Sequence, residues 1–78
     1  MNEKPVILLV DDEELVCNMT KAVLENLNYK VSICRDGKQG VDFYRKAWKD
    51  IDLVIMDFVM PELNGKDAFI SMREINPD

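Results

Sequence analysis

The sequence contains no histidine and little cysteine, so it lacks the side chains that most often ligate transition metals. Its two cysteines, Cys17 and Cys34, do not have the spacing of metal ligands and have no histidine to work with. We therefore expect both to be small apolar side chains that are buried or half-buried.

Long apolar runs and an excess of positive charge are also missing. The longest apolar stretches, residues 6–10 and 53–56, are far too short to cross a bilayer. Residues 1–5 lack the zones of a signal peptide, so we expect a cytoplasmic location without disulfides. Fifteen acidic residues against ten basic give a net charge of -5, which argues against a nucleic-acid surface and points toward cations.

What remains is the composition of a small globular domain. The 78 residues, 47% of them hydrophobic, form one domain at most. A domain of this size buries only about 60–65% of the surface that its unfolded chain exposes, so we expect marginal stability.

Three apolar segments have the pattern of β-strands. Residues 5–10 form a continuous run rich in β-branched side chains, which is typical of a strand buried on both faces. Residues 29–34 alternate polar and apolar side chains, which favours a strand at an edge. Residues 51–56 form the third strand, and Asp57 follows it directly.

Each strand is followed by a segment with helical periodicity. Asn28 is a plausible left-handed stop after the first helix, Asp36-Gly37 starts the second, and Asn76-Pro77 ends a third over residues 66–75. The apolar positions are Leu15, Met19, Ala22, Val23 and Leu27 in the first helix, Gly40, Val41, Tyr44, Ala47 and Trp48 in the second, and Ala68, Phe69, Met72 and Ile75 in the third.

The order β-α-β-α-β-α predicts an α/β fold with a parallel sheet and helices on both faces, joined by right-handed crossovers. In the flavodoxin-like arrangement the three strands lie in the order 2-1-3, and the binding crevice lies beyond the carboxyl ends of strands one and three. Asp11 and Asp12 end strand one, and Asp57 ends strand three. The sequence therefore predicts that these three carboxylates converge.

Three carboxylates in one crevice repel one another by several kcal/mol per close pair at an effective dielectric constant of about 20. A bound cation offsets this repulsion. An all-oxygen site with few protein ligands suits Mg²⁺, or Mn²⁺, which accepts water and phosphate oxygens at its open positions.

A plainer interpretation competes with this one. Asp11 and Asp12 can serve as a helix cap and a first-turn acid, and Asp57 can be an ordinary turn residue. Glu13 fits a charge at a helix N-terminus better than a direct ligand, although it is a candidate for a water-mediated contact with the metal.

The order of these motifs resembles the receiver domain of two-component response regulators, the CheY-like family. The matching parts are Val10-Asp11-Asp12-Glu13 after an apolar strand, Asp36-Gly37 at the start of the second helix, and Asp57 followed by Met60-Pro61 and Gly65. Each part alone is weak, but their order and spacing extend over essentially all 78 residues.

This resemblance implies that Asp57 accepts a phosphoryl group from a histidine kinase. It also implies that Asp11, Asp12 and Asp57 bind Mg²⁺, and that the backbone carbonyl of Val59 is a further ligand. Met60, Pro61 and Gly65 would shape the loop, because Pro61 stiffens it and Gly65 permits close backbone approach. Such a protein is a phosphoacceptor rather than an enzyme, and phosphoryl transfer and self-dephosphorylation are expected of the complete receiver only.

The family has five strands, so residues 1–78 correspond to the N-terminal part of a receiver, without strands 4 and 5 and helices 4 and 5. The threonine or serine and the lysine that complete the family's site lie in that missing part. Strand three then becomes an exposed edge, which invites pairing with another copy of the chain. Two functions remain open: the phosphoacceptor part of a receiver, or a module that acts by binding or self-association without phosphoryl transfer.

Overall fold

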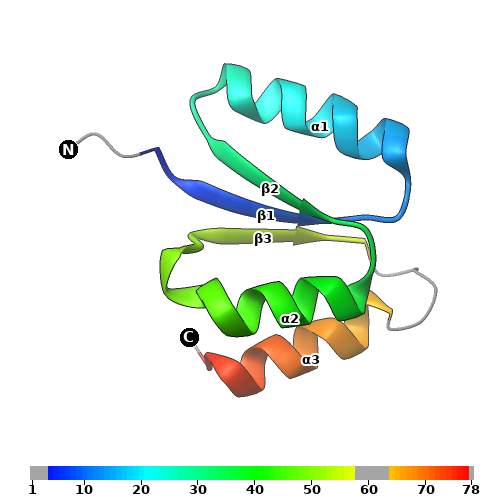
Figure 1. Cartoon of the computed structure of the whole chain (residues 1–78), viewed down its shortest axis with the longest axis vertical. Helices are drawn as coiled ribbons and strands as arrows, with labels where there is room; N and C mark the ends of the chain where they lie inside the picture. Colours follow the sequence, from blue (N-terminus) through cyan, green and yellow to red (C-terminus); the bar gives the residue numbers. More distant parts are fainter. Residues whose placement is uncertain (1–3, 58–63, 78) are drawn as a thin grey trace.

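The computed structural model describes residues 4–57 and 64–77 of the chain. Three strands alternate with helices in a layered α/β arrangement (Figure 1). The elements are β1 (Val6–Val10), α1 (Glu14–Asn26), β2 (Lys30–Cys34), α2 (Gly37–Ala47), the short 3-10 helix η1 (Trp48–Asp50), β3 (Leu53–Met56) and α3 (Gly65–Ile75).

All three strands are parallel and lie in the order β2-β1-β3, which confirms the expected order 2-1-3. Leu8, in the central strand, pairs with Ser32 of β2 and with Val54 of β3. Helix α1 covers one face of the sheet, while α2 and α3 lie side by side on the other (Figure 1). The predicted fold class and the helices on both faces are therefore confirmed.

The core has one part on each face of the sheet, and β1 supplies residues to both. On the α2 and α3 face, Leu8 and Val10 pack with Ala68 and Met72 of α3. On the α1 face, Leu9 packs with Cys17 and Val31. The continuous apolar run of β1 is thus explained, because its side chains alternate between two covered faces.

Capping residues and a left-handed residue mark the ends of the helices. The Asp36 carboxylate accepts a hydrogen bond from the backbone N–H of Gln39 at 2.8 Å, and the Asn64 side chain accepts one from that of Asp67 at 2.9 Å. Both are N-caps of the kind that stabilises a helix start. Asn28 has a φ of 73°, which confirms the left-handed stop predicted after the first helix.

The cysteine prediction is also confirmed, since Cys17 is 1% exposed and Cys34 is 6% exposed, and both are free thiols. Gly40 marks a close approach of α2 to the sheet. A Cβ atom at this position would lie 2.9 Å from a methyl group of Val10, so the helix packs at this distance only without a side chain.

The apolar stripe of α1 does not face the sheet. The helical spacing is confirmed, but Leu15, Met19, Val23 and Leu27 are between 59% and 70% exposed, and Cys17 on another side of the helix contacts the core. A similar difference occurs in α3, where Phe69 is exposed while Ala68 and Met72 are buried. In α2, by contrast, the predicted positions Gly40, Val41 and Tyr44 are buried. Periodicity thus identified the helices and the buried side of α2, but not the buried side of α1.

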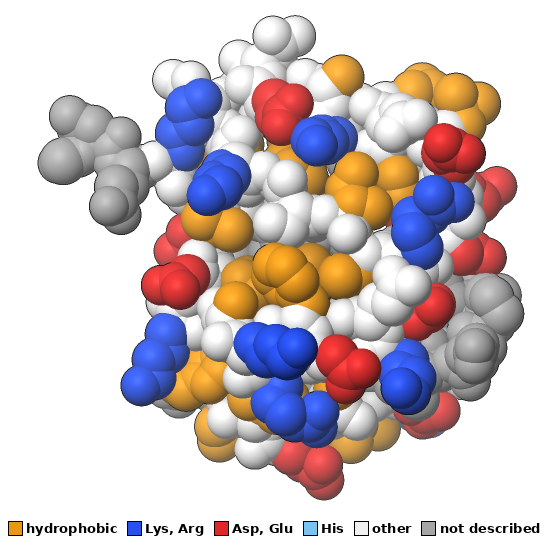
Figure 2. Space-filling model, viewed as in Figure 1, with side chains coloured by type: hydrophobic (Ala, Val, Ile, Leu, Met, Phe, Trp, Pro, Cys, Tyr) orange, Lys and Arg blue, Asp and Glu red, His pale blue; other side chains and the backbone are white. Residues whose placement is uncertain are grey.

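Strand β3 lies at an edge of the sheet and is only partly covered. Leu53 is 54% exposed and Ile55 is 37% exposed on the α1 face, whereas Val54 and Met56 are partly buried on the other. At the start of this strand, Asp52 exchanges hydrogen bonds with the backbone of Val6 in both directions, at 2.7 and 2.9 Å. An apolar area reaches the surface at the level of the sheet in Figure 2.

Candidate metal centre

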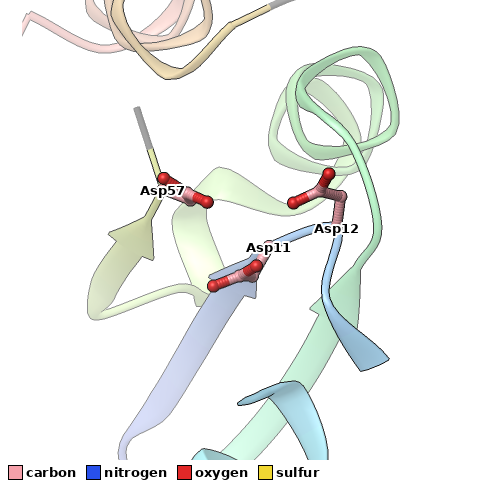
Figure 3. Close-up of side chains that lie close together, drawn as sticks. All are labelled: Asp11, Asp12 and Asp57. Carbon is pink, nitrogen blue, oxygen red and sulfur yellow. The ribbon is translucent and has the colours of Figure 1, made fainter. Parts of the chain in front are cut away.

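Three aspartates converge at the carboxyl edge of the sheet, as the sequence predicts. Each of Asp11, Asp12 and Asp57 offers one carboxylate oxygen, and these oxygens lie within 4.8 Å of one another. All three residues are half-buried. Figure 3 shows the side chains of Asp12 and Asp57 pointing toward each other, with Asp11 at the end of β1 between their two segments.

The sheet itself positions the backbone of two of these residues. The backbone N–H of Asp57 donates to the carbonyl of Val10 at 2.9 Å, and that of Asp11 donates to the carbonyl of Cys34 at 3.1 Å. The hydrogen bonding between neighbouring strands thus continues one residue beyond each strand. Asp11 and Asp57 are fixed relative to each other because both are bonded to adjacent strands.

Further hydrogen bonds order the segment between β1 and α1. The carboxylate Oδ1 of Asp11 accepts from the backbone N–H of Glu13 at 3.0 Å, and its carbonyl accepts from the thiol of Cys17 at 3.3 Å. The N-cap position of α1 belongs to Glu13, which makes no side-chain capping bond. Neither Asp11 nor Asp12 is therefore the helix cap, although Asp11 does order its own loop.

The charges of the site act on the thiol beneath it. Burial raises the pKa of Cys17, and the negative charges of Asp11 and Asp12 raise it further, while the positive charge of Arg35 lowers it. Burial, followed by the charge of Asp36, also raises the pKa of Cys34. Since thiolates are the metal-binding form, both cysteines are poor ligands at neutral pH. The donor set of the site consists of carboxylate oxygens.

This donor set fits a small divalent cation. An octahedral Mg²⁺ ion has ligand oxygens at about 2.0–2.1 Å, so two of its ligands lie about 3 Å apart when adjacent and about 4 Å apart when opposite. Oxygens that already lie within 4.8 Å of one another reach these separations with small side-chain rotations. The half-buried carboxylates also leave part of the site open to water or to a further oxygen ligand.

Some residues predicted for the site lie outside the described residues, namely Val59, Met60 and Pro61. Gly65 is the first residue of α3 and is buried. Glu13 is exposed and directly follows Asp11 and Asp12 in the sequence, and its backbone N–H, rather than its side chain, makes the described hydrogen bond to Asp11.

Arg35 is a further residue near the site that was not predicted, and its guanidinium Nη2 donates to the backbone carbonyl of Asp12 at 3.1 Å. A signal for it was available. Arg35 directly follows β2, the strand next to β1, so the rule that brought the aspartates to the carboxyl edge also applies to it.

Comparison with known proteins gives consistent matches. The family model described as response regulator receiver domain matches residues 7–78. The regulatory protein VanRB of Enterococcus faecalis is 35% identical over 71 residues, which are 90% of this chain and 31% of that protein. The chain therefore spans about a third of the length of this relative.

Solved structures share the fold. A response regulator receiver domain protein from Clostridium thermocellum matches with a TM-score of 0.90 and 30% identity, over 94% of this chain and 58% of that one. The receiver domain of the histidine kinase CKI1 from Arabidopsis thaliana, in complex with Mg²⁺ and BeF₃⁻, has a TM-score of 0.88 at 21% identity, over 94% of this chain and 57% of that one. Among the described residues of the present chain, none of the helices is long and apolar enough to span a membrane.

Proposed function

The chain belongs to the response regulator receiver domain family, and we propose that its Asp57 accepts a phosphoryl group from a histidine kinase. Asp11, Asp12 and Asp57 hold the Mg²⁺ or Mn²⁺ ion that the transfer needs. The observation that carries the proposal is the convergence of three carboxylate oxygens within 4.8 Å at the end of the sheet.

The chemistry follows from the position of Asp57. One oxygen of its carboxylate attacks the phosphorus of a phosphohistidine in line, the P–N bond breaks, and the electron pair returns to the imidazole nitrogen, which is protonated. A bound divalent cation neutralises negative charge on the transferring group. The backbone bond from Asp57 to Val10 keeps the nucleophile at the sheet edge during the reaction. The product is a mixed anhydride that water hydrolyses, so the modification is reversible.

The remaining ligands and the extent of the module are part of the same proposal. The backbone carbonyl of Val59 serves as a further metal ligand, Met60, Pro61 and Gly65 shape the loop, and Glu13 contacts the metal through water. Residues 1–78 correspond to the first three βα units of a receiver, and strands 4 and 5 with their helices complete it. The 58% coverage of the solved receiver from Clostridium thermocellum supports this assignment.

Labelling with a small phosphodonor tests this function. Because residues 1–78 correspond to only part of a receiver, we expect acetyl phosphate and Mg²⁺ to label Asp57 poorly, in a small fraction of molecules, detected by intact-mass and peptide mass spectrometry. Asp57→Asn should abolish the label. Asp50→Asn is the matched control, because Asp50 lies in η1 after α2, away from the site residues. Equal labelling of Asp57→Asn, or none of the unmodified chain, contradicts the proposal.

A second candidate function is self-association through β3 without phosphoryl transfer. Two observations favour it: Leu53 and Ile55 are exposed at the sheet edge, and a hollow of about 530 Å³ lies between this strand and α3. The strand contains no lysine or proline, the residues that commonly protect an edge from pairing.

Sedimentation of the chain at low micromolar concentration distinguishes this second function. Dimers that Ile55→Lys dissociates would support pairing through β3. The matched control is Ile70→Lys on α3, since Ile70 is also exposed but lies on a helix. A folded monomer at this concentration rules out the second function.

A further inference from the structure

The three aspartates of the candidate metal centre are not held equally. Asp11 takes part in three hydrogen bonds, through its backbone N–H, its carbonyl and its carboxylate. Asp57 is bonded to β1 through its backbone N–H. Among the described residues, Asp12 has no hydrogen bond to a strand, and the hydrogen bond that reaches it comes from the guanidinium of Arg35.

Arg35 is itself anchored by the start of α2. Its backbone N–H donates to the side-chain Oε1 of Gln39 at 3.0 Å. Gln39 is in turn fixed because its backbone N–H donates to the capping carboxylate of Asp36 at 2.8 Å. A chain of hydrogen bonds therefore runs from the N-cap of α2 through Gln39 and Arg35 to the backbone of Asp12, 23 residues earlier in the sequence.

We propose that Arg35 is a positioning residue for the metal centre, which holds the backbone of Asp12 so that its carboxylate stays within reach of those of Asp11 and Asp57. This inference rests on the proposed metal binding. It adds a role for a residue that supplies no metal ligand, and it makes the start of α2 part of the support of the site.

Two effects of Arg35 on a cation have opposite signs, which makes the role testable. As a positive charge near three carboxylates, Arg35 repels a cation, so its removal should strengthen binding. Arg35 also holds the backbone of Asp12 through its hydrogen bond. This bond reduces the conformational freedom of Asp12 that metal binding would otherwise have to restrict, so the removal of Arg35 should weaken binding. The charge effect is screened because Arg35 is exposed, whereas the loss of Arg35 leaves Asp12 without its described hydrogen bond.

The experiment is a Mg²⁺ titration followed by backbone amide chemical shifts in NMR spectra, which also report whether each variant is folded. We expect Arg35→Gln to weaken Mg²⁺ binding by about tenfold. Arg35→Lys should recover part of the loss, since an ammonium group can still donate to one carbonyl oxygen. Lys38→Gln is the matched control: it removes the same charge from the start of α2, where the Lys38 side chain is 74% exposed and pairs with Asp42. This control should bind Mg²⁺ as the unmodified chain does, or slightly more tightly.

A double variant shows whether the effect passes through Asp12. In a chain carrying Asp12→Asn, the added change Arg35→Gln should alter Mg²⁺ affinity by less than twofold, because the carboxylate that Arg35 positions is already gone. An undiminished tenfold loss in that background overturns the inference, as does unchanged or tighter binding by the single Arg35→Gln variant. If the unmodified chain itself shows no shifts with Mg²⁺, the proposed metal binding is wrong.

Discussion

The helices cover the two faces of the sheet to different degrees. On the α2 and α3 face, Leu8 and Ala68 are fully buried, both helices begin with a side-chain cap, and the capping residues are Asp36 and Asn64. On the α1 face, one helix without a side-chain cap covers the sheet, and apolar side chains of α1 and β3 remain exposed. The difference indicates that stability is concentrated on the first face, while the second has surface available for association.

The largest effect on stability is expected from Leu8→Ala, in the core on the α2 and α3 face. Leu8 is completely buried in the central strand, so we expect the free energy of unfolding to fall by about 3 kcal/mol or more. The total free energy of unfolding of a domain of this size is only a few kcal/mol, so the variant should be largely unfolded in mild denaturant. Urea titration followed by circular dichroism measures the loss. The control Leu53→Ala, on the exposed edge strand, should cost less than about 1 kcal/mol; similar losses for both would remove the contrast between the faces.

A smaller effect is expected from filling the close contact at Gly40. Gly40→Val places branched carbon atoms against Val10 and should destabilise the chain by about 2 kcal/mol through overpacking. The matched control is Ala22→Val on the exposed side of α1, where the cost is limited to helix propensity, about 0.5 kcal/mol. Thermal unfolding compares the two variants. If Gly40→Val is no less stable than its control, α2 can move away from the sheet without loss.

The capping difference between the faces gives a third test. Asp36→Ala removes the bond to the backbone of Gln39 and should cost about 1 kcal/mol. Glu13→Ala at the N-cap of α1 removes no capping bond and should change stability by less than about 0.5 kcal/mol. Both are measured by urea titration without metal ions. A larger loss for Glu13→Ala would show that the start of α1 depends on this side chain.

The smallest effect on stability should come from the exposed stripe of α1. Met19→Gln and Val23→Gln together are expected to change the free energy of unfolding by less than about 1 kcal/mol, because both side chains are already exposed to water. The same variant should bind less of a hydrophobic dye and associate less at high concentration. An unfolded double variant would mean that the stripe is covered in solution.

Much of this architecture was predictable because the signals are local. The run of apolar residues in β1, the turn at Asn28 and the cap at Asp36 depend on neighbours in sequence, and all three are confirmed. The convergence of the three aspartates was predictable as well, since parallel strands bring their carboxyl ends to one edge.

The parts that sequence reasoning missed depend on distant partners. Helical spacing placed Leu15 and Phe69 on apolar stripes, but which side of a helix meets the sheet is decided by the crossing of whole elements. The sequence also predicted a strand from residue 51, whereas β3 starts at Leu53, because Asp52 turns its carboxylate to the backbone of Val6. The position of Arg35 at the carboxyl end of β2 could have been predicted, but its bond to Asp12 could not, because every residue has a backbone carbonyl and the sequence does not single out this one.

The hydrogen bonds of Asp11 and Asp57 to the neighbouring strands have a consequence for the lifetime of the site. Their amide protons belong to the same cooperative unit as the central sheet, so they should exchange with deuterium only when that unit opens. The backbones of these two residues then separate no more often than β1 parts from its neighbours. Asp12 lies outside this network, and its amide should exchange at the faster rate of the loop.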